Sequence, residues 1–176
     1  MPISLEPVTA DNWRECAALT VRPDQQRFVS PVTYYLCLCH YGAVWHPLAI
    51  VQVPDPAAQR QRHPEHSRDG RVAGFVMWGV DEDGSHWIGG LVVDAAHQGQ
   101  GIGHATVRRL RDRLIAQPGC PNVALSYQPD NTGARRLYRT LGFHETGGET
   151  EGTELVARWT PDAASTVDQV SGRAAG

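Results

Sequence analysis

The sequence has no lysine, since all 16 of its basic residues are arginines. A nucleotide-binding loop of the Walker type needs the motif G-K-S or G-K-T, so the absence of lysine excludes it. Basic residues are not in excess either: 16 of them stand against 19 acidic residues, and the formal net charge is −3. A chain of this charge lacks the positive field that attracts duplex nucleic acids, so no nucleic-acid partner is expected.

Long apolar runs are also missing from the sequence. No stretch approaches the roughly 20 apolar residues that a membrane-spanning helix needs, and the first residues lack the basic head and apolar core of a secretory signal. We therefore expect no membrane partner and a cytoplasmic protein with reduced cysteines. Cys37, Cys39 and His40 have the spacing C-x-C-H without a second ligand pair. This favours structural thiols over a zinc site, and no metal is expected.

Strand and helix patterns alternate over 176 residues in a way typical of one α/β or α+β domain with a mixed sheet. Apolar runs with the period of a strand predict β-structure at residues 3–8, 48–53, 71–80, 86–93, 122–127, 144–146 and 154–159. Helical spacing predicts helices from Asp11 to Pro23, from Ser30-Pro31 onward, and at 101–116 and 131–141.

Two segments differ in composition from the rest of the domain, which we place at residues 1–159. Residues 54–70 are polar and rich in proline, and they predict a mobile loop inserted in the domain. Residues 160–176 are small and polar, and they predict a disordered C-terminal tail.

The strongest functional signal is the segment V-V-D-A-A-H-Q-G-Q-G-I-G-H-A at residues 92–105. It joins a predicted strand to a predicted helix, and Gln98, Gly101 and Gly103 fit the pattern Q/R-x-x-G-x-G. Glycine lets the backbone approach a ligand closely and adopt positive φ. The first N–H groups of a helix have no helical partner, and the helix dipole adds positive potential there. The segment therefore predicts a pyrophosphate site.

Two other interpretations of this loop compete with a pyrophosphate site. A glycine-rich turn that only caps the helix stays open. A Rossmann loop needs G-x-G-x-x-G, but after Gly99 and Gly101 the third position is His104. No acidic residue ends a following strand at the distance expected for a ribose-binding group, so the Rossmann interpretation is disfavoured.

A second motif, L-S-Y-Q-P-D-N-T-G-A-R-R-L-Y-R-T-L-G-F, follows at residues 125–143. Together with the glycine loop it resembles the GNAT acetyltransferase superfamily. That family pairs Q/R-x-x-G-x-G with a later helix of pattern N-x-x-A-x-x-L-Y-x-x-x-G-F. The matching residues are Asn131, Ala134, Leu137, Tyr138, Gly142 and Phe143. The resemblance covers roughly residues 3–159.

The resemblance implies a single GNAT-like domain with helices on both faces of a central sheet. The sheet would be splayed between strands 86–93 and 122–127, and the pantetheine arm of acetyl-CoA would lie in the gap. Backbone groups of the first strand would pair with that arm like an added strand. The cofactor-binding residues so implied are Leu91, Val92, Val93, Gln98, Gly99, Gln100, Gly101, Ile102, Gly103, His104 and Asn131.

The resemblance also gives roles to single residues. Gly89-Gly90 would mark a β-bulge, unless these glycines only make room for packing. Asn131 would cap the second helix. Tyr138 would stand beside the CoA sulfur as general acid, because a tyrosine with a pKa near 10 is protonated at pH 7. The alternative for Tyr138 is a core residue four positions after Ala134.

The acceptor is implied by shorter stretches that resemble bacterial spermine/spermidine acetyltransferases. They are V-T-A-D-N-W at 8–13, Q-Q-R-F-V at 25–29 and G-F-V-M-W-G at 74–79. They imply an N-acetyltransferase acting on a small, polyamine-like primary amine. An antibiotic amine, a protein or peptide amine, and a non-catalytic acyl-CoA sensor are the alternatives, and a homodimer is left open.

Such a reaction needs a group that takes a proton from the amine. An amine with a pKa near 10.4 is mostly charged at pH 7, and freeing it costs about 4–5 kcal/mol. The predicted strand 86–93, which carries a glutamate in some relatives, has none here. His86 and the carboxylates Asp81, Glu82 and Asp83 lie near it in sequence, although a solvated acidic turn is the preferred interpretation of residues 81–83. A relay through ordered water is the further alternative.

Overall fold

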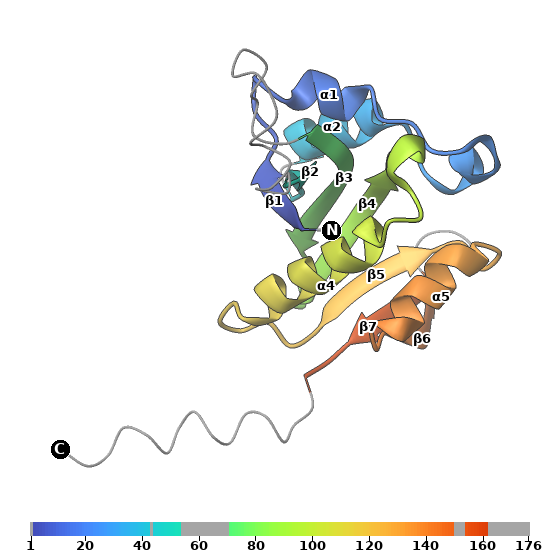
Figure 1. The fold of residues 1–176 in the computed structure, drawn as a ribbon. Helices are drawn as coiled ribbons and strands as arrows, with labels where there is room; N and C mark the ends of the chain where they lie inside the picture. Colours follow the sequence, from blue (N-terminus) through green and yellow to red (C-terminus); the bar gives the residue numbers. More distant parts are fainter. Residues whose placement is uncertain (1, 43, 54–70, 150–153, 162–176) are drawn as a thin grey trace.

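The computed structural model describes residues 2–42, 44–53, 71–149 and 154–161 (Figure 1). The predicted loop at 54–70 and the predicted tail from residue 162 onward lie outside these residues. The elements are β1 Ile3–Pro7, α1 Trp13–Ala17, η1 Pro23–Phe28, α2 Val32–Gly42, β2 His46–Gln52, β3 Arg71–Val80, β4 His86–Val93, η3 Ala95–His97, α4 Ile102–Ile115, β5 Val123–Tyr127, α5 Thr132–Thr140, β6 His144–Glu149 and β7 Leu155–Trp159.

The order of strands and longer helices agrees with the prediction, and β3 and β4 have the predicted bounds. The prediction was wrong at Pro23, which does not close a long first helix. That helix, α1, ends at Ala17, and Pro23 opens the 3₁₀ helix η1 instead. A proline suits the first turn of a helix, because its missing N–H would have no partner there.

One mixed sheet contains all seven described strands, in the order β1-β2-β3-β4-β5-β7-β6. The pair β4–β5 is parallel, and the other five pairs are antiparallel. Helix α4 is the crossover that a parallel pair requires. The last strand in sequence, β7, lies between β5 and β6 and therefore next to the central parallel pair.

Helices cover both faces of the sheet, as predicted (Figure 1). On one face, residues of α4 and α5 pack in one core with strand residues that include Ile88 and Leu125. On the other face, residues of α1 and α2 pack in a second core around Phe75 and Met77. Each core buries the apolar stripe of its helices against the sheet, which is how a layered α/β domain is stabilised.

The sheet is splayed between β4 and β5. These strands pair only at His86–Val123, Trp87–Ala124 and Ile88–Leu125. The last five residues of β4 have no partner on β5, while the other edge of β4 stays paired with β3. The predicted opening between these two strands is therefore confirmed.

A β-bulge in β4 lies at the start of the opening. Met77 of β3 faces Gly89, but Phe75 faces Val92, so β4 contains one extra residue in this interval. Gly90 has φ +59°, a conformation that disfavours other residues. A Cβ atom on Gly89 would also lie 3.1 Å from the ring of Trp45. The glycines thus serve the bulge and close packing together, and the two interpretations do not exclude each other.

Candidate active site

A cleft of about 830 Å³ lies between the splayed strands. This volume is in the usual range for small-molecule sites. Of the residues predicted for the site, ten line the cleft: Leu91, Val93, Gln98, Gly99, Gly101, Ile102, Gly103, His104, Asn131 and Tyr138. Val92 packs in the core on the α1–α2 side, and the Gln100 side chain accepts a hydrogen bond from Gln52. Neither of these two residues lines the cleft.

The glycine loop has the conformation that its sequence requires at two positions. Gly99 has φ +78° and Gly101 has φ +77°, and Gly101 is the N-cap of α4. Gly103 is different, because it lies inside α4 without positive φ, and a Cβ there would make ordinary contact 3.6 Å from Leu137. Glycine was expected at 103 partly because the backbone there would be strained with any other residue. That expectation is wrong, because Gly103 has no positive φ.

The loop leads into the N-terminus of a helix with 14 residues. The first N–H groups of such a helix and its dipole favour an anion. Gln98 holds the loop in place, because its Nε2 donates to Val93 O at 3.0 Å and to Gln25 Oε1 at 2.8 Å. The buried Gln98 Oε1 has no hydrogen-bond partner in the described part of the chain. Gln98 thus ties the end of β4 to η1.

The unpaired edge of β4 can bind an extended chain. Between Gly89 and Val93 its backbone groups on the β5 side have no strand partner. An extended ligand with amide groups can add to such an edge as a further strand, in the way that peptides add to open sheets. The pantetheine arm of CoA is a ligand of this kind.

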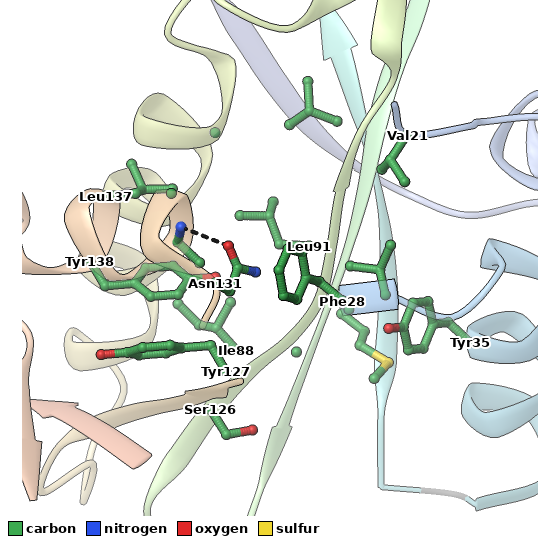
Figure 2. Close-up of a pocket in the computed structure, with 18 of the residues that line it drawn as sticks. Val21, Phe28, Tyr35, Ile88, Leu91, Ser126, Tyr127, Asn131, Leu137 and Tyr138 are labelled. Carbon is green, nitrogen blue, oxygen red and sulfur yellow. Dashed lines mark hydrogen bonds between the residues drawn. The ribbon is translucent and has the colours of Figure 1, made fainter. Parts of the chain in front are cut away.

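Three tyrosines line the cleft, and only one has a free hydroxyl. The Tyr127 hydroxyl donates to Glu145 at 2.8 Å, and the Tyr35 hydroxyl accepts from the Ser30 N–H at 3.0 Å. The Tyr138 hydroxyl makes no hydrogen bond with any described residue. Figure 2 shows the Tyr138 ring beside that of Tyr127 and directed toward Asn131.

Tyr138 is 8% exposed, and its ring centroid lies 5.4 Å from that of Tyr127. Burial raises the pKa of Tyr138 well above the ordinary value, and the nearby Tyr127, Tyr35 and Glu154 raise it further. Its hydroxyl therefore stays protonated at neutral pH, as a proton donor must.

Asn131 caps α5 as predicted. Its Oδ1 accepts a hydrogen bond from the Ala134 N–H at 3.1 Å, which Figure 2 draws as a dashed line. The cap leaves the side-chain amide at the wall of the cleft. The amide can donate a hydrogen bond to a ligand there.

Two of the groups that the sequence suggested as the base, His86 and Asp83, form hydrogen bonds outside the cleft. His86 is 5% exposed, and its ring nitrogens lie 3.1 Å from Gly84 O and from Gln117 Oε1. It does not line the cleft, so it is wrong as a candidate base. Asp83 accepts from the N–H and the hydroxyl of Ser85, and these bonds lower the pKa of its carboxyl. Asp81 does line the cleft.

Ser126 and Glu154 are among the polar cleft residues that were not predicted from the sequence. The Ser126 hydroxyl donates to Glu154 Oε2 at 2.6 Å, and both side chains line the cleft near Tyr127 (Figure 2 labels Ser126). The available signal was weak: Ser126 is a polar residue in the otherwise apolar strand V-A-L-S-Y. Glu154 directly precedes the last strand and has no motif around it.

Segment η1 reaches across the cleft to the loop before α5. Arg27 forms an ion pair of 2.6 Å with Asp130, and Gln128 Nε2 donates to Arg27 O at 3.4 Å. The next residue, Phe28, lines the cleft. The sequence had marked residues 25–29 only by their resemblance to polyamine acetyltransferases, and it did not predict this bridge.

Opposite charges stand at the two ends of the cleft. Arg22 lines one end of the cleft. It stands three residues before Gln25, which is hydrogen-bonded to Gln98 of the glycine loop. Asp81 lines the cleft at the other end of β4, and Glu154 lies on the β5 side. The loop end is thus suited to an anion and the far end to a cation.

No helix in the described part of the chain is long and apolar enough to cross a membrane. Among the same residues, no group of three or more histidines, cysteines, aspartates or glutamates could hold a metal ion.

A family model, curated relatives and solved structures all match this chain. A sequence model described as the acetyltransferase (GNAT) family matches residues 40–143. The spermine/spermidine N(1)-acetyltransferase of Bacillus subtilis is 27% identical over 159 residues, which cover 84% of this chain and 91% of that protein.

Solved structures agree in fold. The spermidine N-acetyltransferase of Vibrio cholerae, in complex with CoA and spermine, has a TM-score of 0.63 at 16% identity and covers 89% of this chain and 92% of that one. The ribosomal-protein-S18-alanine N-acetyltransferase of Escherichia coli has a TM-score of 0.58 at 20% identity, with coverages of 89% and 91%.

Proposed function

Because the chain belongs to the acetyltransferase (GNAT) family, and is thereby an acyl-CoA-dependent N-acetyltransferase, we propose that its acceptor is a small, polyamine-like primary amine and that Tyr138 is the general acid. The observation that carries the acid role is the Tyr138 hydroxyl at the cleft, which bonds to no described residue, whereas the Tyr127 hydroxyl already donates its proton to Glu145.

The binding mode of acetyl-CoA follows from the two ligand-binding features of the cleft. The α4 N-terminus with Gly99 and Gly101 is suited to the pyrophosphate. The open edge of β4 is suited to the pantetheine arm, which then points its thioester toward Tyr138. Both features stand on the walls of one cleft, so a single extended ligand can use them together.

The charge of the cleft supports a cationic acceptor. Asp81 and Glu154 contribute carboxylates away from the glycine loop, where a charged amine gains favourable electrostatic energy. The similar enzyme of Bacillus subtilis is named for spermine and spermidine, and its alignment covers 84% of this chain. A polycation with several amines can use both carboxylates.

Tyr138 acts when the CoA thiolate leaves. As the acceptor nitrogen bonds to the thioester carbon, the bond from that carbon to sulfur breaks and negative charge passes to the sulfur. The Tyr138 hydroxyl, held protonated by burial, donates its proton to this thiolate. Since the hydroxyl has no partner among the described residues, it is free to turn toward the sulfur.

An acceptor screen with acetyl-CoA, read by release of free thiol, tests the acceptor class. We expect turnover with spermidine, spermine or simple diamines. If all of these fail while an aminoglycoside or a peptide is acetylated, the polyamine assignment is wrong and the acceptor is of that other class. Acetyl-CoA that binds without turnover of any amine would identify a sensor.

A further inference from the structure

The pair Ser126–Glu154 has no structural task that requires a carboxylate in a cleft. The Ser126 hydroxyl donates to Glu154 Oε2 at 2.6 Å, while the partners of most other carboxylates here are backbone N–H groups or arginines. Both side chains are partly buried and line the cleft. The Ser126 hydroxyl is a neutral partner, so it orients the carboxylate without pairing it with an opposite charge.

Glu154 lies near the residue that we propose as the acid. Its charge is one of the causes, after burial, that raise the pKa of both Tyr138 and Tyr35. Tyr138 belongs to α5 and Tyr35 to α2, and both tyrosines line the same cleft as Glu154. Ser126 follows Leu125, the last residue of β5 that pairs with β4. The pair therefore stands where the sheet opens.

Other titratable groups of the cleft are placed differently. His97 and His104 flank the glycine loop, where the pyrophosphate is expected. Asp81 lies at the far end of β4, where its Oδ1 accepts from the Glu82 N–H. Among the described side chains that line the cleft, Glu154 is thus the carboxylate that stands with Tyr138 at the opening of the sheet.

We propose that Glu154, oriented by the Ser126 hydroxyl, binds the acceptor ammonium beside the thioester and takes its proton. This inference rests on the proposed function, since it assigns the base for that same reaction. Ser126 is then a positioning residue, which acts through Glu154.

The protons of the reaction balance as follows. The acceptor R–NH₃⁺ gives one proton to the Glu154 carboxylate, and the freed nitrogen lone pair forms the bond to the thioester carbon. The carbon–sulfur bond breaks, Tyr138 protonates the leaving thiolate, and the nitrogen gives its second proton back to Tyr138. Glu154 releases its proton to solvent. The products are the acetylated amine, the CoA thiol and one proton.

The test compares two kinds of amine with Glu154→Gln, which keeps size and hydrogen bonding but removes the charge. One amine is spermidine, charged at the assay pH, and the other is a primary amine whose pKa lies below the assay pH. We expect kcat/KM for spermidine to fall by about 10²-fold. The loss for the uncharged amine should be at least tenfold smaller, and acetyl-CoA affinity should stay unchanged. A merely structural defect would lower both amines alike.

Glu82→Gln is the matched control, since it removes a carboxylate that does not line the cleft. It should leave both activities at the wild-type level. If Glu154→Gln does not fold, Ser126→Ala replaces it, with the same selective loss expected at smaller size and with rescue by Ser126→Thr.

The outcomes separate the two proposals. If wild type acetylates spermidine and Glu154→Gln does so equally well, or loses both amines alike, the role of Glu154 is overturned while the proposed function stands. If wild type acetylates no amine, the proposed function fails and the role of Glu154 fails with it.

Discussion

The Tyr138 hydroxyl is the atom on which the proposed mechanism depends most. Its ring packs against Tyr127 and Phe143, with centroids 5.4 and 6.1 Å away. Tyr138→Phe keeps that packing and removes only the proton donor. We expect kcat and kcat/KM to fall together by about 10²-fold, because the proton is transferred only in the transition state. Steady-state kinetics with the best acceptor, under conditions where chemistry limits the rate, measures this.

Tyr127→Phe is the control for that variant and should behave in the opposite way. It breaks the hydrogen bond to Glu145 and should lower the free energy of unfolding by about 1 kcal/mol, with near-normal kcat. Full kcat in Tyr138→Phe would make Tyr138 a packing residue.

Two glycines of the same motif should respond differently to alanine. Gly101→Ala forces φ +77° on a residue with a Cβ, which should cost about 1–2 kcal/mol of stability. Gly103→Ala lies inside α4 with room for a methyl group, and should stabilise the helix by up to about 1 kcal/mol. Urea unfolding of the two variants without ligand measures both effects. Equal destabilisation would contradict the conformations described.

Gly103 should matter for the ligand more than for the fold. It lines the cleft in the first turn of α4, so the larger side chain of Gly103→Val would stand where the pyrophosphate is expected. We expect acetyl-CoA affinity to fall at least tenfold, measured by calorimetry, while the protein stays folded. Unchanged affinity would count against the loop as the phosphate site.

At the scale of elements, the Glu145 carboxylate connects β6 to α5 and β5. Glu145 accepts from Arg135 Nε at 2.7 Å and Nη2 at 2.8 Å, and from the Tyr127 hydroxyl. Arg135 first, and then Tyr127, lower the pKa of Glu145. Since the folded value is the lower one, this stabilisation is present above the unfolded pKa of about 4.3 and is lost as pH falls through the folded pKa.

Glu145→Gln should therefore be less stable than wild type at pH 7, and the difference should shrink as pH falls toward 3. Urea unfolding across this range measures it. A difference that does not change with pH would show that charge on Glu145 contributes nothing.

At the scale of the whole molecule, a ligand in the cleft would contact both halves of the splayed sheet. β4 and β5 share only three paired positions, so few backbone bonds hold the halves together at this point. Acetyl-CoA that binds only the folded state should add about 2.7 kcal/mol at a concentration of 100 Kd. For a chain of this size, this corresponds to a rise in Tm of about 5–10 °C.

Thermal unfolding with and without acetyl-CoA measures this shift, and Gly103→Val should show a smaller one at the same concentration. No shift at millimolar acetyl-CoA, in a sample shown to be folded, would contradict binding in the cleft.

Local patterns in the sequence were sufficient for most elements and for the glycine loop and helix cap that line the cleft. Apolar periodicity gave β3 and β4 their bounds, because buried strands need continuous apolar runs. The spacing of Gln98, Gly101 and Asn131 marked the loop and the cap, since these depend on backbone conformation within a few residues. Pro23 misled the prediction, because a proline can end one helix or open the next.

Contacts between distant segments were decided only by the tertiary structure. The sequence by itself located the glycine loop and the tyrosine for which we propose phosphate binding and proton donation. It could not determine that the Tyr127 and Tyr35 hydroxyls form hydrogen bonds while that of Tyr138 does not, or that His86 lies near Gly84 O and Gln117 Oε1 and does not line the cleft. Ser126 and Glu154 meet across 28 positions because β7 inserts between β5 and β6. Strand order follows from the burial of whole faces, which no local pattern encodes.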